Sequence, residues 1–203
     1  GGVLPPDQGG PEVYPILMKH QPNAIVFQGP APGGIRWIGN EAGVAAYPCW
    51  STVKQLNDPG PGDPDGSIWN PGECDVPLPG HGWFLQGRYQ ATTSDDQQRQ
   101  TLTQLMDMYH RSVGHNCNLL LNATPDATGL IPEALVPHYA NFGKEIRRRF
   151  ATPIAETRGE GVTVELTLAQ PAALNHVILM EDIAQGERIR AYVVEGLVGG
   201  DTW

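Results

Sequence analysis

The sequence predicts an α/β fold with a parallel sheet over residues 1–150, followed by an all-β module. Short apolar runs alternate with amphipathic segments of helical length up to residue 150, and beyond it the hydrophobic period becomes two. Thirty of the 44 glycines and prolines lie in residues 1–90, which indicates long loops between short elements there. We therefore expect a linker at residues 151–160 and the β-module at residues 161–203.

The first half is expected to hold three short elements. Residues 11–20 are predicted to form a helix, which Pro22 ends. Residues 24–27 then form a short buried strand, and residues 35–38 are a second strand candidate. Residues 44–70 show no periodicity that indicates a helix or strand.

The second half is more regular. Residues 95–112 form an amphipathic pattern whose buried stripe comprises Leu102, Leu105, Met106 and Tyr109. The apolar run at residues 118–122 is typical of a strand buried on both faces of a parallel sheet. Residues 133–150 predict another helix, which ends in three arginines that suit the helix dipole.

The β-module is predicted from alternation. Residues 162–168 alternate apolar and polar side chains, and residues 176–181 and 189–196 are further strand candidates. Three strands are too few for a closed sandwich, so we expect the module to be incomplete, as the first part of a larger one.

Composition excludes several function classes. The 203 residues carry a net charge of -9 with 13 lysines and arginines, which argues against a nucleic-acid partner. No apolar run approaches the ~20 residues of a membrane helix. Cys49, Cys74 and Cys117 lack the spacing of a metal site, and no phosphate loop or dinucleotide fingerprint occurs, so neither a metal nor a cofactor is expected.

Carboxyl groups in loops rich in tryptophan and glycine are the candidate catalytic groups. Glu41 lies just after a predicted strand end, where α/β barrels place their chemistry, although it could instead cap a helix or pair with Arg36. Glu73 and Asp75 are a second acidic pair, with Trp83 as a possible sugar platform. The alternative for that stretch is a turn with solvent-facing carboxylates and a core tryptophan.

Several motifs together resemble the α-L-fucosidases of glycoside hydrolase family 29. They are Gln21-Pro-Asn-Ala-Ile-Val-Phe27, Arg36-Trp-Ile-Gly-Asn-Glu41, Trp69-Asn-Pro-Gly-Glu73-Cys-Asp75, Trp83-Phe84, Tyr109-His-Arg-Ser-Val-Gly114, Asn116-Cys-Asn-Leu-Leu-Leu-Asn122, Pro125-Asp126 and Phe142-Gly143. Their order and spacing match across residues 1–150. The resemblance implies that residues 1–150 are the second half of a (β/α)8-like TIM barrel, and that residues 161–203 begin a β-sandwich.

The resemblance also implies a chemistry. Family members are retaining exo-enzymes that remove terminal α-linked L-fucose with two carboxyl groups about 5–5.5 Å apart. The family's nucleophile is an Asp in a Trp-Phe-Asp-Gly-like motif, which this sequence lacks. The stretch that starts at Gly1 resembles the family's residues directly after that Asp. We therefore expect the nucleophile just upstream of Gly1, and this chain to be inactive by itself.

The resemblance assigns roles to five residues. Glu41 is the expected acid/base, and Glu73 is the runner-up for that role. Arg36, Trp37 and Trp83 are expected to bind substrate. The implied substrate is a fucosylated oligosaccharide or glycoconjugate, and the implied location is secreted, periplasmic or lysosomal. The alternative is a non-catalytic fragment that binds carbohydrate or another partner.

Overall fold

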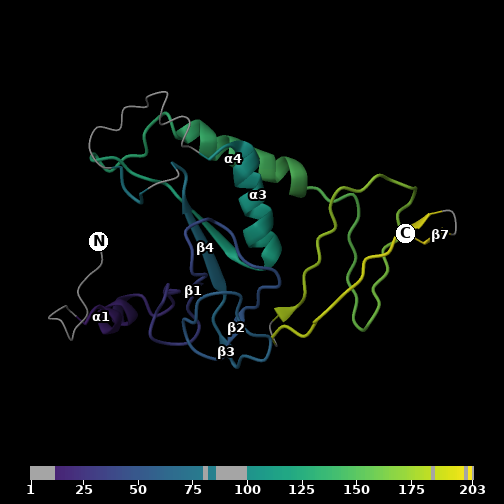
Figure 1. Ribbon diagram of the computed structural model, residues 1–203, viewed down its shortest axis with the longest axis horizontal. Coiled ribbons are helices and arrows are strands. Elements are labelled where there is room, and N and C mark those ends of the chain that lie inside the picture. Colours follow the sequence, from purple (N-terminus) through teal and green to yellow (C-terminus); the bar gives the residue numbers. More distant parts are fainter. Residues whose placement is uncertain (1–11, 80–81, 86–99, 184–185, 199–200, 203) are drawn as a thin grey trace. The chain divides into compact units, whose positions relative to one another are not determined.

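The computed structural model describes residues 12–79, 82–85, 100–183, 186–198 and 201–202 (Figure 1). Its elements in chain order are α1 (Val13–His20), β1 (Arg36–Trp37), β2 (Thr52–Val53), β3 (Ile68–Trp69), β4 (Gly72–Pro77), α3 (Leu102–Ser112), a 3-10 turn (Val113–His115), β5 (Asn118–Asn122), α4 (Val136–Phe150), β6 (Leu197–Val198) and β7 (Asp201–Thr202). Helices occur together with a sheet in which β1 and β4 are parallel, so the predicted α/β class is confirmed at this level.

The main sheet has three strands in the order β1-β4-β5, with β4 in the centre. Strands β1 and β4 are parallel, and Trp37 pairs with Glu73 in their register. Two smaller antiparallel pairs complete the strands of the described residues: β2 with β3, and β6 with β7. The strand predicted at residues 35–38 is present as β1, which pairs with β4.

Strand β4 covers a stretch for which one alternative prediction was a turn with solvent-facing carboxylates. This alternative is wrong. Pro71, Gly72 and Pro77 suggested a loop, but the residues between them alternate in a period-two pattern. Cys74 and Val76 are 0% and 2% exposed, and this apolar side holds the strand in the core. Ladder partners on both sides of β4 outweigh the turn propensity of its ends.

The predicted helices are confirmed, with shorter limits. α3 begins at Leu102, and residues 95–99 of the predicted segment lie outside the described residues. Leu105 and Met106 are 1% and 3% exposed as expected, whereas Leu102 is 41% exposed. α4 ends in the expected arginines, and Arg148 and Arg149 both bind the carboxylate of Glu145 on the same helix.

The start of the described chain is more exposed than predicted. α1 has no buried residue, and residues 24–27 form no strand. Phe27 makes a single bridge to Ile35, and the side chains of Ile25 and Phe27 are 70% and 43% exposed. Strand β5 is present, but its residues are exposed or half-buried, so burial on both faces is also wrong. The apolar composition of these short runs therefore predicted more burial than the structure has.

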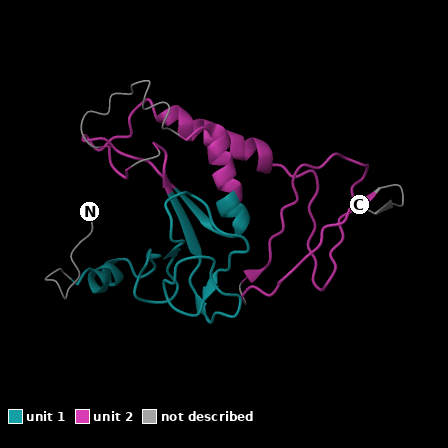
Figure 2. Cartoon of the chain, viewed as in Figure 1, with its two compact units in different colours: residues 1–75, 111–120 teal, residues 76–110, 121–203 magenta. Residues whose placement is uncertain are grey.

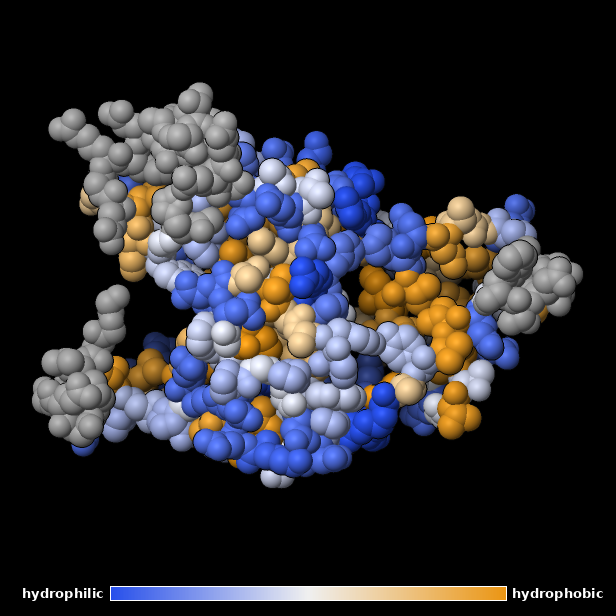
Figure 3. Space-filling model, viewed as in Figure 1, coloured by the Kyte–Doolittle hydropathy of each residue, from blue (hydrophilic) through white to orange (hydrophobic). Residues whose placement is uncertain are grey.

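The segment after α4 does not form the predicted strands. No described residue between 161 and 196 belongs to a strand, and Val162 and Met180 are 107% and 90% exposed. Hydrophobic residues consequently gather on the surface of this part of the chain (Figure 3). An alternating strand needs a ladder partner and a second sheet over its apolar face, and these residues have neither.

The chain divides into two compact units (Figure 2). The first comprises residues 1–75 and 111–120, and the second comprises residues 76–110 and 121–203. The division into barrel half, linker and β-module stays a prediction. Within the described ranges, the structure contains no helix that is both long and apolar enough to cross a membrane.

The core of the first unit surrounds three thiols. Ile38, Ala45, Cys49, Cys74 and Cys117 form one buried cluster, against which Leu119 packs. The Sγ atoms of Cys49 and Cys117 lie 3.3 Å apart, and none of the three cysteines forms a disulfide within the described residues. This cluster packs against the face of β4 that carries Cys74. The side chains on the opposite face of β4 are therefore available to form a site.

Candidate active site

The candidate site lies where β1 ends beside β4. Strand residues two apart point to the same face, so Glu73 and Asp75 share one face of β4. Trp37, the last residue of β1, is paired with Glu73 in the register. Its indole Nε1 donates a hydrogen bond to Oδ1 of Asp75 over 2.8 Å. A tryptophan and two carboxyl groups therefore meet at the carboxyl end of β1, in the first compact unit.

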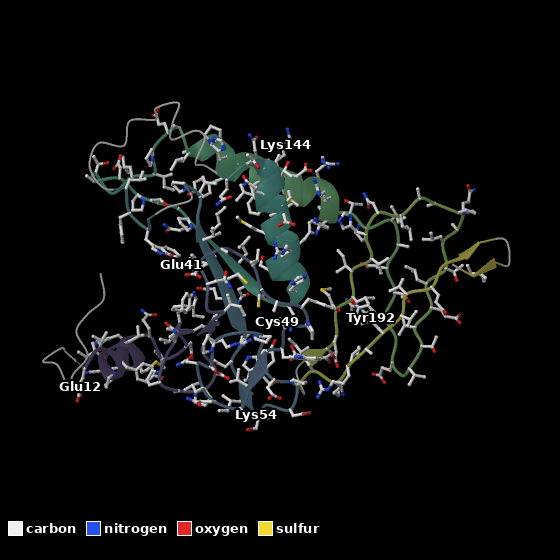
Figure 4. The ribbon with its side chains drawn as sticks, viewed as in Figure 1. Glu12, Glu41, Cys49, Lys54, Lys144 and Tyr192 are labelled. Atoms are coloured by element: carbon white, nitrogen blue, oxygen red, sulfur yellow. The ribbon has the colours of Figure 1, made fainter. Side chains whose placement is uncertain are left out.

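The loop that carries Glu41 leaves β1 at this point and is tied to β4 at two places. The amide of Ile38 donates to the carbonyl oxygen of Glu73 at 3.1 Å, and the amide of Gly43 donates to that of Asp75 at 3.2 Å. Gly39 turns the chain between these contacts with a φ of +95°, which a side chain would strain. Glu41 is exposed in this loop, and Figure 4 shows it beside β4.

Asn40 gives the loop its internal shape. Its Oδ1 accepts a hydrogen bond from the amide of Ala42 at 3.0 Å, as in an Asx-turn. Its Nδ2 donates to the carbonyl oxygen of Val44 at 3.2 Å. Glu41 thus sits in a turn that its own neighbours close, which presents its carboxyl group outward from a defined backbone.

Burial sets the electrostatics of the site. Asp75 is 7% exposed, and its burial raises the pKa of its carboxyl group. The hydrogen bonds from Trp37 and from its own backbone oppose this by lowering the pKa, whereas the charge of Glu41 raises it further. The pKa of Glu73 is also raised, first by burial and then by the charge of Asp75. Neighbouring carboxyl groups that resist ionisation are the groups that general acid catalysis uses.

Arg36 does not face this site. Its side chain is 0% exposed, and its guanidinium donates to the carbonyl oxygens of Asn70, Trp50 and Gly60, the latter two at 2.9 and 3.1 Å. Arg36 and Trp37 point to opposite faces because successive strand residues alternate. The geometry gives Arg36 the role of holding loops in the interior, so substrate binding by Arg36 stays a prediction that these contacts do not support.

Trp83 belongs to the second compact unit and is half-buried. Its carbonyl oxygen accepts a hydrogen bond from Nδ2 of Asn122 at 2.9 Å. This contact fixes the backbone beside the indole, and the sugar-binding role of Trp83 stays a prediction.

Sequence reasoning missed the bond between Trp37 and Asp75. The two residues are 38 positions apart, so no local pattern joins them. The alternation of Cys74 and Val76 with Glu73 and Asp75 could have revealed a strand with one apolar and one acidic face. Among the described residues, no group of three or more histidines, cysteines or carboxylates is placed to hold a metal ion.

Carboxyl groups beside the carboxyl end of a parallel strand are typical of glycoside hydrolases with an α/β fold. Within this class of enzymes, the known proteins to which the chain is similar are α-L-fucosidases. Alpha-L-fucosidase 1 of Arabidopsis thaliana is 35% identical over 70% of this chain, and a rice protein assigned the same activity is 35% identical over 91% of it. No family model matches the chain.

Solved structures of fucosidases are also similar to the chain. A crystal structure assigned as an α-L-fucosidase of Bacteroides thetaiotaomicron covers 100% of this chain with a TM-score of 0.85 and 37% identity. A family 29 fucosidase of Ruminococcus gnavus in complex with fucose covers 59% of it, with a TM-score of 0.50 and 34% identity. The resemblance to the family 29 α-L-fucosidases is therefore confirmed.

The chain matches only part of each relative. It spans 28% of the Arabidopsis protein, 42% of the rice protein, 49% of the Bacteroides chain and 24% of the Ruminococcus chain.

Proposed function

We propose that this chain carries the acid/base half of a retaining exo-α-L-fucosidase, with Glu41 as the acid/base. The observation that carries the proposal is the loop of Glu41, which is bonded to β4 on both sides of its turn and lies beside Trp37 and Asp75. The similarity to α-L-fucosidases over most of the chain supports the substrate, a terminal α-linked L-fucose.

The proposed reaction has two displacements. An aspartate outside this chain attacks the anomeric carbon, and Glu41 donates its proton to the leaving glycosidic oxygen, so that a covalent fucosyl-enzyme and a free alcohol form. Glu41, now a carboxylate, removes a proton from water as the water oxygen attacks the anomeric carbon. The bond to the aspartate breaks, fucose leaves with its configuration retained, and Glu41 is protonated again.

The same proposal includes the architecture. The α/β part is half of a (β/α)8 barrel, with the missing strands and the nucleophile contributed by residues before Gly1. The exposed apolar residues after α4 belong to an unfinished β-sandwich, as the alternation of residues 162–168 suggests. A fucosidase of this kind acts on glycoconjugates in a secreted, periplasmic or lysosomal setting.

Substitution of Glu41 in the full-length protein tests the proposal. Glu41→Ala is expected to slow hydrolysis of natural fucosides by about 10²–10⁴-fold, because their leaving oxygen needs a proton. Fucosides with an activated aryl leaving group should still form the fucosyl-enzyme. Azide should then restore turnover, because it needs no general base, and the product should be α-fucosyl azide. Glu133→Ala, which changes an exposed glutamate outside the site, is the matched control.

Two results would contradict the assignment. Normal activity of Glu41→Ala together with loss of activity and azide rescue in Glu73→Ala would make Glu73 the acid/base. A full-length protein that hydrolyses no α-L-fucoside would contradict the function itself.

A second candidate function is non-catalytic carbohydrate binding. It is favoured by the apolar surface after α4, which suits a binding partner (Figure 3). Saturable binding of L-fucose by the 203-residue chain, measured by calorimetry, would support this function. Absence of binding together with hydrolysis by the full-length protein would leave the enzyme as the function.

A further inference from the structure

Asp75 makes two connections within the candidate site. Its side-chain Oδ1 accepts the hydrogen bond from Nε1 of Trp37 at 2.8 Å. Its backbone oxygen accepts the amide of Gly43 at 3.2 Å, two residues after Glu41. One residue of β4 therefore holds both the indole ring and the loop of the acid/base.

The surroundings of Asp75 are unusual for a buried carboxyl group. It is 7% exposed, yet in the described part of the chain its side chain has one hydrogen bond to another residue, Trp37, and no ion pair. The charge of Glu41, from the loop after β1, raises the pKa of Asp75, and the charge of Asp75 in turn raises the pKa of Glu73, two positions before it on β4.

Burying a carboxyl group without a cation costs folding free energy. Such a group is more often found at functional sites than in structural cores. The thiol core lies on the other face of β4, so Asp75 is not required to fill it.

We infer that Asp75 is a positioning residue of the acid/base site, which orients the Trp37 ring through its side chain and fixes the loop of Glu41 through its backbone oxygen. This inference rests on the proposed function. Asp75 acts through these two neighbours and needs no contact with the sugar.

Two substitutions separate the hydrogen bond from the charge. The amide oxygen of Asn can still accept the indole N–H, so Asp75→Asn removes only the charge. Asp75→Leu removes both and leaves an apolar side chain of similar size. Asp58→Asn and Asp58→Leu are matched controls, because Asp58 is an exposed aspartate in the same compact unit.

The first readout is the kinetics of the full-length protein. Asp75→Asn should leave KM for an aryl fucoside within about twofold, because its amide oxygen still accepts the indole N–H. Asp75→Leu should raise KM, because the freed indole ring loses its fixed orientation, and should lower kcat/KM by about 10²-fold. The Asp58 variants should match the wild type in both measurements.

The second readout needs no activity. Tryptophan emission of the chain is measured against pH, and the signal of Trp37→Phe is subtracted to isolate Trp37. The remaining titration should follow the ionisation of Asp75 and disappear in Asp75→Asn. In Glu41→Gln its midpoint should move to lower pH, because the charge of Glu41 raises the pKa of Asp75.

The outcomes distinguish this inference from the function on which it rests. A wild-type protein without fucosidase activity overturns both. An active wild type overturns this inference alone if Asp75→Leu keeps the KM and kcat/KM of the wild type. A Trp37 titration that persists in Asp75→Asn also overturns it, even if Asp75→Leu fails to fold.

Discussion

Nη2 of Arg36 donates a hydrogen bond to the carbonyl oxygen of Trp50 at 2.9 Å, within the first compact unit. The same nitrogen bonds the carbonyl oxygen of Gly60, and Nη1 bonds that of Asn70. One buried cation thereby joins three loop positions to β1. The buried Nε atom has no hydrogen-bond partner among the described residues, so Arg36 already carries a desolvation cost that its other bonds offset.

Arg36→Met should destabilise the chain by about 3 kcal/mol, because it removes a buried donor group that bonds three carbonyl oxygens. The measurement is urea unfolding monitored by circular dichroism. Arg36→Lys, which keeps the charge but has fewer donors in a different geometry, should recover part of the loss. A change below about 0.5 kcal/mol for Arg36→Met would show that these bonds contribute little.

The thiol of Cys117 should be unreactive in the folded chain. Its hydrogen bond with Cys49 by itself would lower the pKa, but the hydrogen bond with Cys74 and burial raise the pKa to about 12. The thiolate is the reacting form, so iodoacetamide at pH 8 should label Cys117 only after unfolding, as seen by mass spectrometry. Rapid labelling of the native chain would contradict this expectation.

The raised pKa of Cys117 also has a consequence for stability. The folded state binds the thiol proton more tightly than the unfolded state, so the stabilisation is complete below the ordinary pKa of 9.0. It is lost as the pH rises from there towards about 12. Cys117→Ser should remove this part of the alkaline decline in the urea midpoint.

His110 should make the second unit sensitive to acid. Its ring stacks on that of His176 with centroids 5.1 Å apart and planes at 8°. Burial lowers the pKa of His110, and the charges of His176 and Arg149 lower it further, with a small opposing effect of Asp107. The stabilisation is therefore complete above the ordinary pKa of 6.5 and is lost as the pH falls through the folded value.

The test is the urea midpoint between pH 8 and pH 5. The midpoint of the wild type should fall with pH, and that of His110→Gln should fall less. His20→Gln, an exposed histidine in α1, is the control and should behave like the wild type. Parallel curves for wild type and His110→Gln would mean that the stacked pair does not carry the acid sensitivity.

Gly72→Ala should disturb the pairing of β1 and β4. A Cβ at this position would lie 2.9 Å from Sγ of Cys117 and 3.1 Å from Cδ1 of Ile38. Overpacking of this kind costs about 1–3 kcal/mol, measurable by urea unfolding. Adding Cys117→Ala should recover most of the loss, because the space of the sulfur becomes free. Equal and additive losses in the double variant would contradict the steric explanation.

Much of the α/β layout was predictable from local pattern. α3 and α4 repeat apolar residues with helical period, and that signal depends on neighbours within one or two turns. β1 was also predictable from a local pattern, the short, mostly apolar run at residues 35–38. β4 was missed because Pro71 and Gly72 outweigh a short alternation when only the sequence is considered. The strands expected between residues 161 and 196 failed for the opposite reason. Their alternation is clear, but no partner strand in the described part of the chain pairs with them.

The candidate site, too, was predictable from the sequence only in part. The sequence by itself determined that Glu41 lies just after a strand end, that Trp37 precedes it, and that Glu73 and Asp75 alternate with apolar residues. Only the tertiary structure decided that Trp37 bonds Asp75 across 38 positions and that Arg36 points into the core. The physical reason is range: backbone propensity acts over a few residues, whereas strand register and burial are set by segments far apart in the chain.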